Sequence, residues 1–366
     1  MTDEAAGSTQ QAVACPHCAE PVGAADRFCE GCGGSLLVCR TPLGGPQGRV
    51  ASGDCVACGG TQLDPDGFCA ECGRAQPSGR DRMEYDLGFV AGVSDRGKRR
   101  SRNEDSMAFA VVNSPDHGEA VVAVVCDGVA TSERADSASQ AAVDAALAAL
   151  VEGVLDRIGD EPATSAGVAA ASEAVAALAR PEAPGIAPSC TYVSAVVTGE
   201  RVTVGWVGDS RAYWLGSPSS SLTADDTVAA ELMAEGMSEV DALSVPQAHA
   251  LSRWIGADAA TAAPGIATIE PGEPGYLLLC SDGLWNYVPE AGTLHDLVRT
   301  AVSSVSSGSA VPVFEPGAGE RKAGTAPMTA AVELTRLAIE LGGNDNITVV
   351  VVPFPLAGDL AKEHGR

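Results

Sequence analysis

Basic residues are scarce in this chain, and so are long apolar runs. Lysine and arginine total 23 against 48 aspartates and glutamates, so the 366 residues carry a formal charge of −25. Non-specific binding to nucleic acid or to an anionic membrane needs a basic surface, so neither partner is expected. No apolar run reaches the roughly 18 residues of a membrane span. The alanine-rich stretch 138–155 contains Asp144 and Glu152 and predicts an amphipathic helix instead.

The N-terminus also lacks the marks of an export signal. It reads MTDEAAGSTQQAVAC, which starts acidic and has no apolar central segment. Cys15 follows small residues, but without that segment we do not interpret it as a lipidation site. We therefore expect a cytoplasmic protein, in which cysteines stay reduced and available to metal.

The cysteines that are present are concentrated near the N-terminus. Eight of the twelve lie in the first 72 residues, in two sets with the spacing C-x2-C-x10-C-x2-C. The sets are Cys15, Cys18, Cys29 and Cys32, followed by Cys55, Cys58, Cys69 and Cys72. The second set is offset from the first by 40 residues (55 minus 15), and the flanking sequences "RFCEGCGG" and "GFCAECGR" repeat as well. This pattern indicates an internal duplication of a small module.

Four thiolates from two such pairs are typical ligands of a tetrahedral structural Zn²⁺, which predicts two zinc ions. Disulfides or redox pairs are the alternative interpretation. Residues 12–75 resemble the zinc-ribbon family, with ribbon 1 at 12–36 and ribbon 2 at 53–75. Some zinc ribbons bind nucleic acid, but residues 1–80 carry nine acidic and five basic residues, which favours a structural or protein-contact role. We expect the ribbons to be separable from the rest of the chain.

The remaining boundaries follow from composition. Residues 1–11 are expected to be a disordered tail, 37–52 and 76–84 linkers, 85–354 the main domain and 355–366 a second tail. Strand-like apolar runs occur at 87–93, 107–112, 120–126, 192–198, 202–207, 276–280 and 347–352. Helical stretches occur at 132–158, 163–179, 228–237, 294–305 and 328–341. Strands in groups with helices in separate blocks predict an α+β fold with antiparallel sheets layered with helices.

Acidic residues stand at the ends of several predicted strands. Asp127 ends "VVAVVCDG", Asp282 ends "YLLLCSDG", and Asp345 precedes the last strand in "GGNDNITVVVV". Asp209 lies in "VGWVGDSRAY", and Glu104 in "RRSRNEDS". Any one of these could simply be a turn former. Carboxylates converging from several strand ends are, however, the ligands that Mg²⁺ and Mn²⁺ prefer.

Residues 85–354 resemble the metal-dependent, protein phosphatase 2C-like family of serine/threonine phosphatases, of the bacterial type. The resemblance is carried by "SDRGKRRSRNEDS", "VVCDG", "VGDSRAYWL", "LTADDTVAAELMAEG", "LLCSDGLW" and "GGNDNITVVVV", which occur in family order. It implies a four-layer α-β-β-α sandwich, two antiparallel sheets flanked by helices, with a dinuclear Mn²⁺ or Mg²⁺ site at one end. Phosphorylated proteins and a serine/threonine kinase signalling pathway are the implied partners.

The resemblance also implies a role for individual residues. Asp127 should bridge the two metals, Asp282 and Asp345 should complete one of them, and Gly128 should offer its carbonyl to the other. Glu104 should act through water, and Arg100 should bind the substrate phosphate. Asp209 should serve a weaker third metal, and 225–246 should form a flap beside the site. A metal-activated water would attack phosphorus, so no protein nucleophile is required. Cys39, Cys126, Cys190 and Cys280 are expected to be core residues without a catalytic role.

Three positions depart from the family pattern. Val129-Ala130-Thr131 replaces the usual Met-Gly-Gly, Ser189 stands where glycine is common, and Asn286 stands where a third-metal aspartate is usual. Because the residues of the two-metal core are present, we expect an active phosphatase. The alternative is a catalytically weak or inactive phosphatase-like domain that acts as a regulatory binding or scaffold module.

Overall fold

The computed structural model of the chain describes most of the main domain and parts of both ribbons. The described residues are 13–15, 18, 20–23, 26–46, 55, 57–64, 68–74, 76–114, 118–180, 186–259, 263–306, 312–313 and 322–356. The predicted tail at 1–11 and nearly all of the predicted tail at 355–366 lie outside them.

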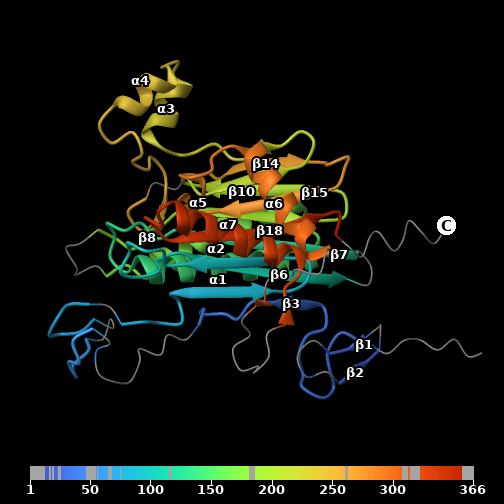
Figure 1. Cartoon of the computed structure of the whole chain (residues 1–366). Helices are drawn as coiled ribbons and strands as arrows, with labels where there is room; N and C mark the ends of the chain where they lie inside the picture. Colours follow the sequence, from blue (N-terminus) through green and yellow to red (C-terminus); the bar gives the residue numbers. More distant parts are fainter. Residues whose placement is uncertain are drawn as a thin grey trace, which may run out of the picture.

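Two six-stranded antiparallel sheets form the centre of the protein (Figure 1). The first sheet consists, in spatial order, of β14 (Gly265–Ile269), β10 (Val202–Val207), β9 (Tyr192–Val197), β7 (Gly118–Cys126), β6 (Ser106–Ser114) and β3 (Val38–Arg40). The second consists of β12 (Ser220–Ser221), β11 (Arg211–Leu215), β15 (Gly275–Cys280), β18 (Ile347–Phe354), β5 (Ala91–Asp95) and β4 (Arg82–Asp86). Three short pairs complete the strands: β1 (Val13–Ala14) with β2 (Pro21–Val22), β8 (Ser189–Cys190) with β13 (Ile255–Gly256), and β16 (Pro312–Val313) with β17 (Lys322–Ala323).

The valine-rich strands are buried on both faces, because successive side chains of a strand point to opposite sides of its sheet. In β7, Val121 and Val125 join the core between the two sheets. Val122 and Val124, which alternate with them, pack instead into the core under the helices of the first sheet. This explains why the strand reads as a continuous apolar run.

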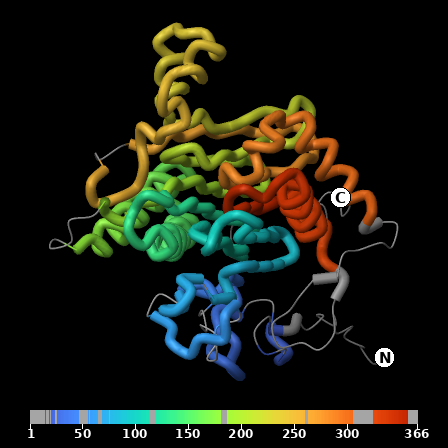
Figure 2. The backbone as a smooth tube through the Cα atoms, turned by 60° about the vertical axis from the view of Figure 1, so that its left-hand side comes forward, coloured from blue at the N-terminus to red at the C-terminus, as the bar shows by residue number. Residues whose placement is uncertain are grey.

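Helices cover the outer face of each sheet (Figure 2). Helices α1 (Ala135–Asp156) and α2 (Asp160–Ala176) pack on the first sheet, and α5 (Asp282–Trp285), α6 (Ala291–Ser306) and α7 (Ala326–Leu341) pack on the second. The predicted four-layer α-β-β-α arrangement is therefore confirmed.

Helix α1 is, among the described helices, the one long and apolar enough by length and composition to cross a membrane. It buries Ala138, Ala142 and Leu147 against the first sheet. A long core helix passes the same test of length and hydropathy, so this property alone says little about a membrane.

Two predicted elements differ most from the structure. Of the predicted strand 87–93 only 91–93 is strand, within β5, because residues 87–90 form the turn between β4 and β5, where Gly88 has φ 84° and donates its N–H to Asp86 Oδ1 at 2.9 Å. The predicted helix 228–237 is two helices, α3 (Val228–Ala234) and α4 (Glu239–Ser244), because Gly236 adopts φ 100° between them. These two helices project from the body of the molecule (Figures 1 and 2).

The ribbons lie on the side of the body opposite α3 and α4, apart from one another (Figure 1). Part of the predicted linker 37–52 is a strand: β3 pairs with β6, with Val38 opposite Val112. Thr41 extends this contact by donating its N–H to Phe109 O at 3.0 Å. A three-residue edge strand carries too little periodicity to be recognised in a sequence. The N-terminal region therefore contributes to the sheet of the main domain as well as carrying the cysteines.

Candidate active site

The predicted site aspartates lie where central strands begin or end. Asp127 directly follows β7, Asp282 follows β15 after Ser281, and Asp345 comes two residues before β18. Asp209 lies in the turn between β10 and β11. Strands β15 and β18 are antiparallel neighbours, with Cys280 opposite Val349, so the end of β15 and the start of β18 meet. The two sheets thus bring these carboxylates to one end of the sandwich.

The electrostatics of these aspartates show how close they are. Burial raises the pKa of Asp127 well above its usual range, and the charges of Asp105, Asp282, Asp209 and Asp345 raise it further. Burial and the charges of Asp345 and Asp209 raise the pKa of Asp282 to about 8. For Asp209, burial followed by the charge of Asp225 raises the pKa to about 7. The cluster (Asp105, Asp127, Asp209, Asp282 and Asp345) therefore concentrates negative charge in a region of restricted solvent access.

One buried oxygen of this cluster supports a cation site directly. Asp282 Oδ1, like Asp105 Oδ1, is shielded from solvent and accepts no hydrogen bond from the described residues. A buried carboxylate oxygen without a donor is costly, whereas a divalent cation would satisfy it and offset the repulsion among the acids. Clustered carboxylate oxygens match the preferences of Mg²⁺ and Mn²⁺. The residues present fit the metals that the fold implies.

Arg100 and Glu104 lie in the loop between β5 and β6, at the edge of the cluster. Arg100 Nη2 is 2.5 Å from Asp345 Oδ2, and this hydrogen bond raises the pKa of the guanidinium. The Glu104 N–H donates to Asn346 Oδ1 at 2.8 Å, while its carbonyl accepts from Ser139 Oγ at 2.5 Å. The backbone of Glu104 is thus fixed between α1 and the turn before β18. The structure brings both predicted residues to the carboxylates.

Gly128 occupies a position where only glycine fits. A Cβ there would lie 2.6 Å from Ala135 O and 2.7 Å from Glu104 O. The Gly128 N–H itself donates to Glu104 O at 3.2 Å. Two of the nearby residues that depart from the family pattern contact each other, because Val129 donates its N–H to Ser189 O at 3.0 Å. The loop after Asp127 therefore keeps ordered contacts despite its unusual sequence.

Asp105, which lies beside Glu104 in the motif "RRSRNEDS", is a member of the cluster to which the sequence assigns no role. It is fully buried and accepts hydrogen bonds from Ser281 Oγ and Thr348 Oγ1, both at 2.7 Å. Burial raises its pKa to about 6. Because its partners come from the end of β15 and from β18, Asp105 ties the β6 strand of one sheet to two strands of the other. Its place next to Glu104 in the motif was the one available signal.

The predicted third-metal region contains Asp209, Trp285 and Asn286. Asp209 accepts a hydrogen bond from Trp285 Nε1 on its carbonyl oxygen at 2.9 Å. The Arg211 guanidinium lies 3.7 Å from the Trp285 ring centroid and pairs with Asp225 at 2.7 Å, where the predicted flap 225–246 begins. Asn286 Nδ2 donates to Asp282 Oδ2 at 3.2 Å. Asn286 is therefore close to the cluster but supplies no negative charge.

The four remaining cysteines are not nucleophiles of this site. Cys126, Cys190 and Cys280 are fully buried, and burial raises the pKa of the Cys126 and Cys280 thiols. These two groups stay protonated at neutral pH, whereas the thiolate is the reactive form of cysteine. The prediction of core residues is therefore confirmed for the three buried cysteines, whereas Cys39 on β3 is only half-buried.

Each cysteine quartet of the ribbons is assembled at one point. The Sγ–Sγ distances are 3.8 Å for Cys15–Cys32, 3.5 Å for Cys18–Cys29, and 3.6 Å for both Cys55–Cys72 and Cys58–Cys69. All eight are free thiols, so the geometry does not support disulfides. A tetrahedral site with Zn–S bonds of about 2.3 Å places its sulfurs about 3.8 Å apart. Both quartets match this spacing and could hold a metal ion.

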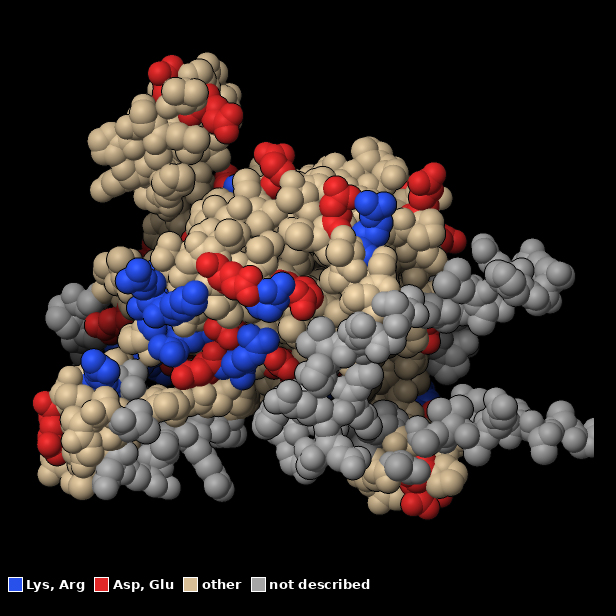
Figure 3. Space-filling model, viewed as in Figure 1, with Lys and Arg blue, Asp and Glu red and all other residues tan. Residues whose placement is uncertain are grey.

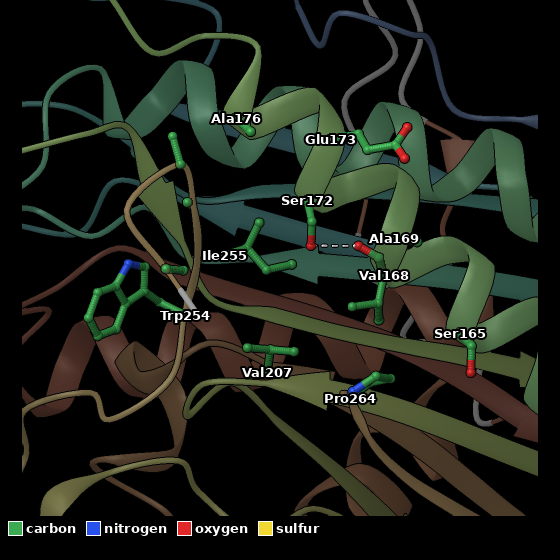
Figure 4. A pocket seen from close by; sticks show the side chains of 13 residues that line it. Ser165, Val168, Ala169, Ser172, Glu173, Ala176, Val207, Trp254, Ile255 and Pro264 are labelled. Carbon is green, nitrogen blue, oxygen red and sulfur yellow. Dashed lines mark hydrogen bonds between the residues drawn. The ribbon is translucent and has the colours of Figure 1, made fainter. Parts of the chain in front are cut away.

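A cavity of about 430 Å³ lies beside α2 (Figure 4). Helix α2 forms one wall through Val168 and Ser172, whose hydroxyl donates back to Val168 O at 2.9 Å. Trp254 and Ile255 line the opposite side. None of the clustered acids is among the residues that line this cavity.

Positive charge is unevenly distributed on the surface. Figure 3 shows Lys and Arg side chains gathered in one area of the face drawn, among scattered acidic groups. The densest cationic stretch of the chain is 96–102, which contains four arginines and one lysine. Within it Lys98 and Arg99 are exposed. The loop that carries Arg100 thus provides positive charge beside the acidic cluster.

Comparisons with known proteins agree with this site. A family model described as "Protein phosphatase 2C" matches residues 94–311. The serine/threonine phosphatase stp of Listeria welshimeri is 28% identical over 263 residues, covering 71% of this chain and 93% of that protein. The serine/threonine protein phosphatase PstP of Mycobacterium tuberculosis is 29% identical over 269 residues, covering 71% of this chain and 44% of that protein. A crystal structure of the PstP catalytic domain with two manganese ions has 27% identity and a TM-score of 0.52, covering 72% of this chain and 97% of that one.

The matched family segment spans more than half of the 366 residues and includes Arg100, Glu104, Asp127, Asp209 and Asp282. The relatives are named as phosphatases, so the alternative of an inactive binding module is not favoured. The two sheets, the acidic cluster at their end and these similarities agree, and the chain therefore belongs to the protein phosphatase 2C family and is an enzyme of that type.

Proposed function

We propose that this enzyme hydrolyses phosphoserine and phosphothreonine in proteins, using two Mn²⁺ or Mg²⁺ ions. The observation that carries the proposal is the buried acidic cluster, in which Asp282 Oδ1 and Asp105 Oδ1 lack hydrogen-bond partners among the described residues, beside the cation Arg100. The names of the relatives support the substrate class. A serine/threonine kinase pathway and a cytoplasmic location are further proposals that rest on the sequence.

The residues that would hold the metals are Asp127, the Gly128 carbonyl, Asp282, Asp345 and, through water, Glu104. When bound, such metals lower the pKa of a water molecule and neutralise phosphate charge. Asp105 acts behind these groups by joining β6 to β15 and β18, so that their ligands stay in register. Asp209 would serve a weaker third metal, with Asn286 as a neutral neighbour.

Arg100 would bind the substrate phosphate. Its guanidinium presents several N–H donors in a plane, which suits the oxygens of a phosphate group. About a third of the side chain is exposed (38%), so it is accessible to a substrate from outside while it contacts Asp345. The buried Cys126 and Cys280 take no part, because their raised pKa keeps them as thiols.

We also propose that each cysteine quartet holds one Zn²⁺. Soft thiolates favour zinc, whereas the oxygen cluster favours Mn²⁺ or Mg²⁺, so one chain would carry two classes of metal. Elemental analysis of protein prepared under reducing conditions should find about two zinc ions per chain. Protein that is well folded but free of zinc would contradict this.

The test of the catalytic proposal is the Asp282→Asn variant. It keeps the shape of the side chain but removes a charge that would bind metal, so turnover of a phosphothreonine peptide with Mn²⁺ should fall by a factor on the order of 100 or more. EDTA should abolish the activity of the wild-type enzyme. Circular dichroism provides the folding control. A wild-type protein that is folded, loaded with Mn²⁺ and inactive would overturn the proposal.

A further inference from the structure

An aromatic side chain of ribbon 2 contacts the loop that carries Arg100. Phe68 immediately precedes Cys69, and the Arg102 guanidinium carbon lies 4.1 Å from the centre of the Phe68 ring. This is within the distance of a cation–π interaction. Arg102 is two residues from Arg100 and two from Glu104. Its carbonyl accepts a hydrogen bond from Asn346 Nδ2 at 2.8 Å, and the other amide atom of Asn346, Oδ1, accepts the Glu104 N–H.

The chain that leaves ribbon 2 holds the same loop at a second point. Asp81 accepts the Arg96 N–H on its carbonyl at 2.9 Å, and its carboxylate lies 3.5 Å from Arg96 Nε. Arg96 Nη1 in turn donates to the Arg100 carbonyl at 2.8 Å. The backbone of the phosphate-binding arginine is therefore bonded to a side chain that this segment orients.

Arg80 provides a third point of attachment. Its guanidinium donates to the Asp105 carbonyl at 2.9 Å and to Ser106 Oγ at 2.8 Å, and its own carbonyl accepts from Asn103 Nδ2 at 2.9 Å. The segment is also tied back to the thiols, because Gln76 Nε2 donates to Cys55 Sγ at 3.2 Å. The described residues 68–74 and 76–81 thus include contacts with the second quartet and with both ends of the loop 96–106.

The duplicated module supplies its own comparison. Phe28 occupies the position in ribbon 1 that Phe68 occupies in ribbon 2, 40 residues later and likewise before a cysteine. Phe28 is 62% exposed. The phenylalanine is therefore not needed simply to build the module, and its packing against Arg102 is specific to the second copy.

We propose that ribbon 2 is a positioning element for substrate binding, in which Phe68 packs on Arg102 and so fixes the loop that presents Arg100 to the phosphate. The inference rests on the proposed function, because it assumes that Arg100 binds substrate phosphate. With the contact removed, Arg100 would occupy its binding orientation for a smaller fraction of the time. Phosphate affinity falls in proportion to that fraction.

The experiment compares Phe68→Ala with Phe28→Ala in the full-length, Mn²⁺-loaded protein. We expect Phe68→Ala to raise the Kd of inorganic phosphate, measured by calorimetry, and the KM of a phosphothreonine peptide by about 3–10-fold, which is the range of a single cation–π contact. Phe28→Ala should change neither. Phe68→Tyr, which retains the ring, should restore the wild-type values.

A second variant separates positioning from damage to the ribbon. Arg102→Met keeps a long side chain but removes the cation, and it should raise the Kd of phosphate at least as much as Phe68→Ala, because the charge of Arg102 also acts on Glu104. The double variant should be no worse than Arg102→Met alone, since Phe68 then has no cation to contact. Zinc content should stay at the wild-type level in Arg102→Met. Equal phosphate affinity in the wild type, Phe68→Ala and Arg102→Met, or fully additive losses in the double variant, would overturn the proposal.

Hydrogen exchange of residues 97–106 gives a readout that needs no turnover. Exchange there should be faster in Phe68→Ala and Arg102→Met than in the wild type and Phe28→Ala. If the wild type has no phosphatase activity but the variants show this exchange pattern, the proposed function is wrong, whereas the contact between Phe68 and Arg102 still orders the loop. Active enzyme with unchanged exchange in all variants would remove the positioning role alone.

Discussion

The cysteine quartets and the acidic cluster are both sets of metal ligands, but they are built in different ways. Each quartet is formed by residues within 18 positions of one another, on short loops with few apolar neighbours. In the acidic cluster, Asp127, Asp282 and Asp345 lie next to the ends of strands that belong to two large sheets. Local spacing assembles the first kind of site, whereas the whole sandwich assembles the second.

The two quartets also differ from each other, although their spacing is identical. Ribbon 1 exposes Phe28, while ribbon 2 packs Phe68 on Arg102. At another equivalent position, Leu36 packs against the first quartet, whereas Gln76 donates a hydrogen bond to Cys55. The duplication thus preserved the cysteine ligands, whereas the residues around them determine whether each ribbon contacts the main domain.

Truncation of the N-terminal region should change the free energy of unfolding more than any other change proposed below. Removing residues 1–36 deletes ribbon 1 but leaves β3, and the free energy of unfolding should change by less than about 1 kcal/mol. Removing residues 1–81 also deletes β3 and Arg80, and several buried partners lose their hydrogen bonds. Stability should then fall by about 3–5 kcal/mol. Urea denaturation in Mn²⁺ measures both values, and equal stability of the two truncated proteins would contradict the integrated role of residues 37–81.

The pH dependence of the metal-free protein should distinguish the acidic cluster from the thiols. The folded pKa of Asp282 is raised to about 8 and that of Asp209 to about 7, so the folded state retains protons that the unfolded chain releases near pH 4. The stabilisation contributed by these two groups is therefore fully present below about pH 4 and is lost as the pH rises through about 7 and 8, by about 1–3 kcal/mol.

Thermal unfolding in EDTA at pH 5.5 and pH 8.0 measures this effect. We expect a lower midpoint at pH 8.0, and Mn²⁺ should reverse the loss. Asp282→Asn, which cannot ionise, should shrink the difference, while Cys29→Ser should leave it unchanged. A midpoint that rises between the two pH values would show that the buried acids do not dominate.

Serine substitutions in the two ribbons should have smaller effects than truncation and should distinguish the role of ribbon 2 from that of ribbon 1. Cys29→Ser and Cys69→Ser each leave three thiols, so each should cost one zinc ion per chain, because metal binding and folding are coupled in such modules. Only Cys69→Ser should raise the KM for a phosphopeptide, by about 3–10-fold, since it loosens the ribbon that carries Phe68. Elemental analysis and steady-state kinetics measure the two effects. An equal rise in KM for both variants would indicate a general loss of stability.

The smallest expected effect concerns Asn286. Asn286→Asp places a third carboxylate beside Asp282 and Asp209, which should tighten a weak third Mn²⁺ site by about 3–10-fold, as one added partly exposed charge contributes roughly 1 kcal/mol. Titration of activity with Mn²⁺ in the millimolar range measures it. Identical titration curves for the wild type and Asn286→Asp would contradict a third site at this position.

Much of the site could be predicted because its motifs are short and continuous. "SDG" after β15 and "GGNDN" before β18 each place an acid at a strand end, and buried strands are recognisable from their valines. The role of Asp105 cannot be predicted from its motif, because it depends on Ser281 and Thr348, which are 176 and 243 residues away in the chain. Strand β3 was missed because three residues cannot display a period.

The sequence by itself determined the ligand sets, because each depends on residue type and local spacing: thiolates in duplicate, and acids at the ends of apolar strands. It also determined the layered α+β class through the grouping of its apolar runs. Only the tertiary structure decided which ribbon meets the enzyme and which acids share one charge cluster. Contacts such as that of Phe68 with Arg102 join segments whose separation along the chain carries no pattern, so their existence depends on how the packed layers place their loops in space.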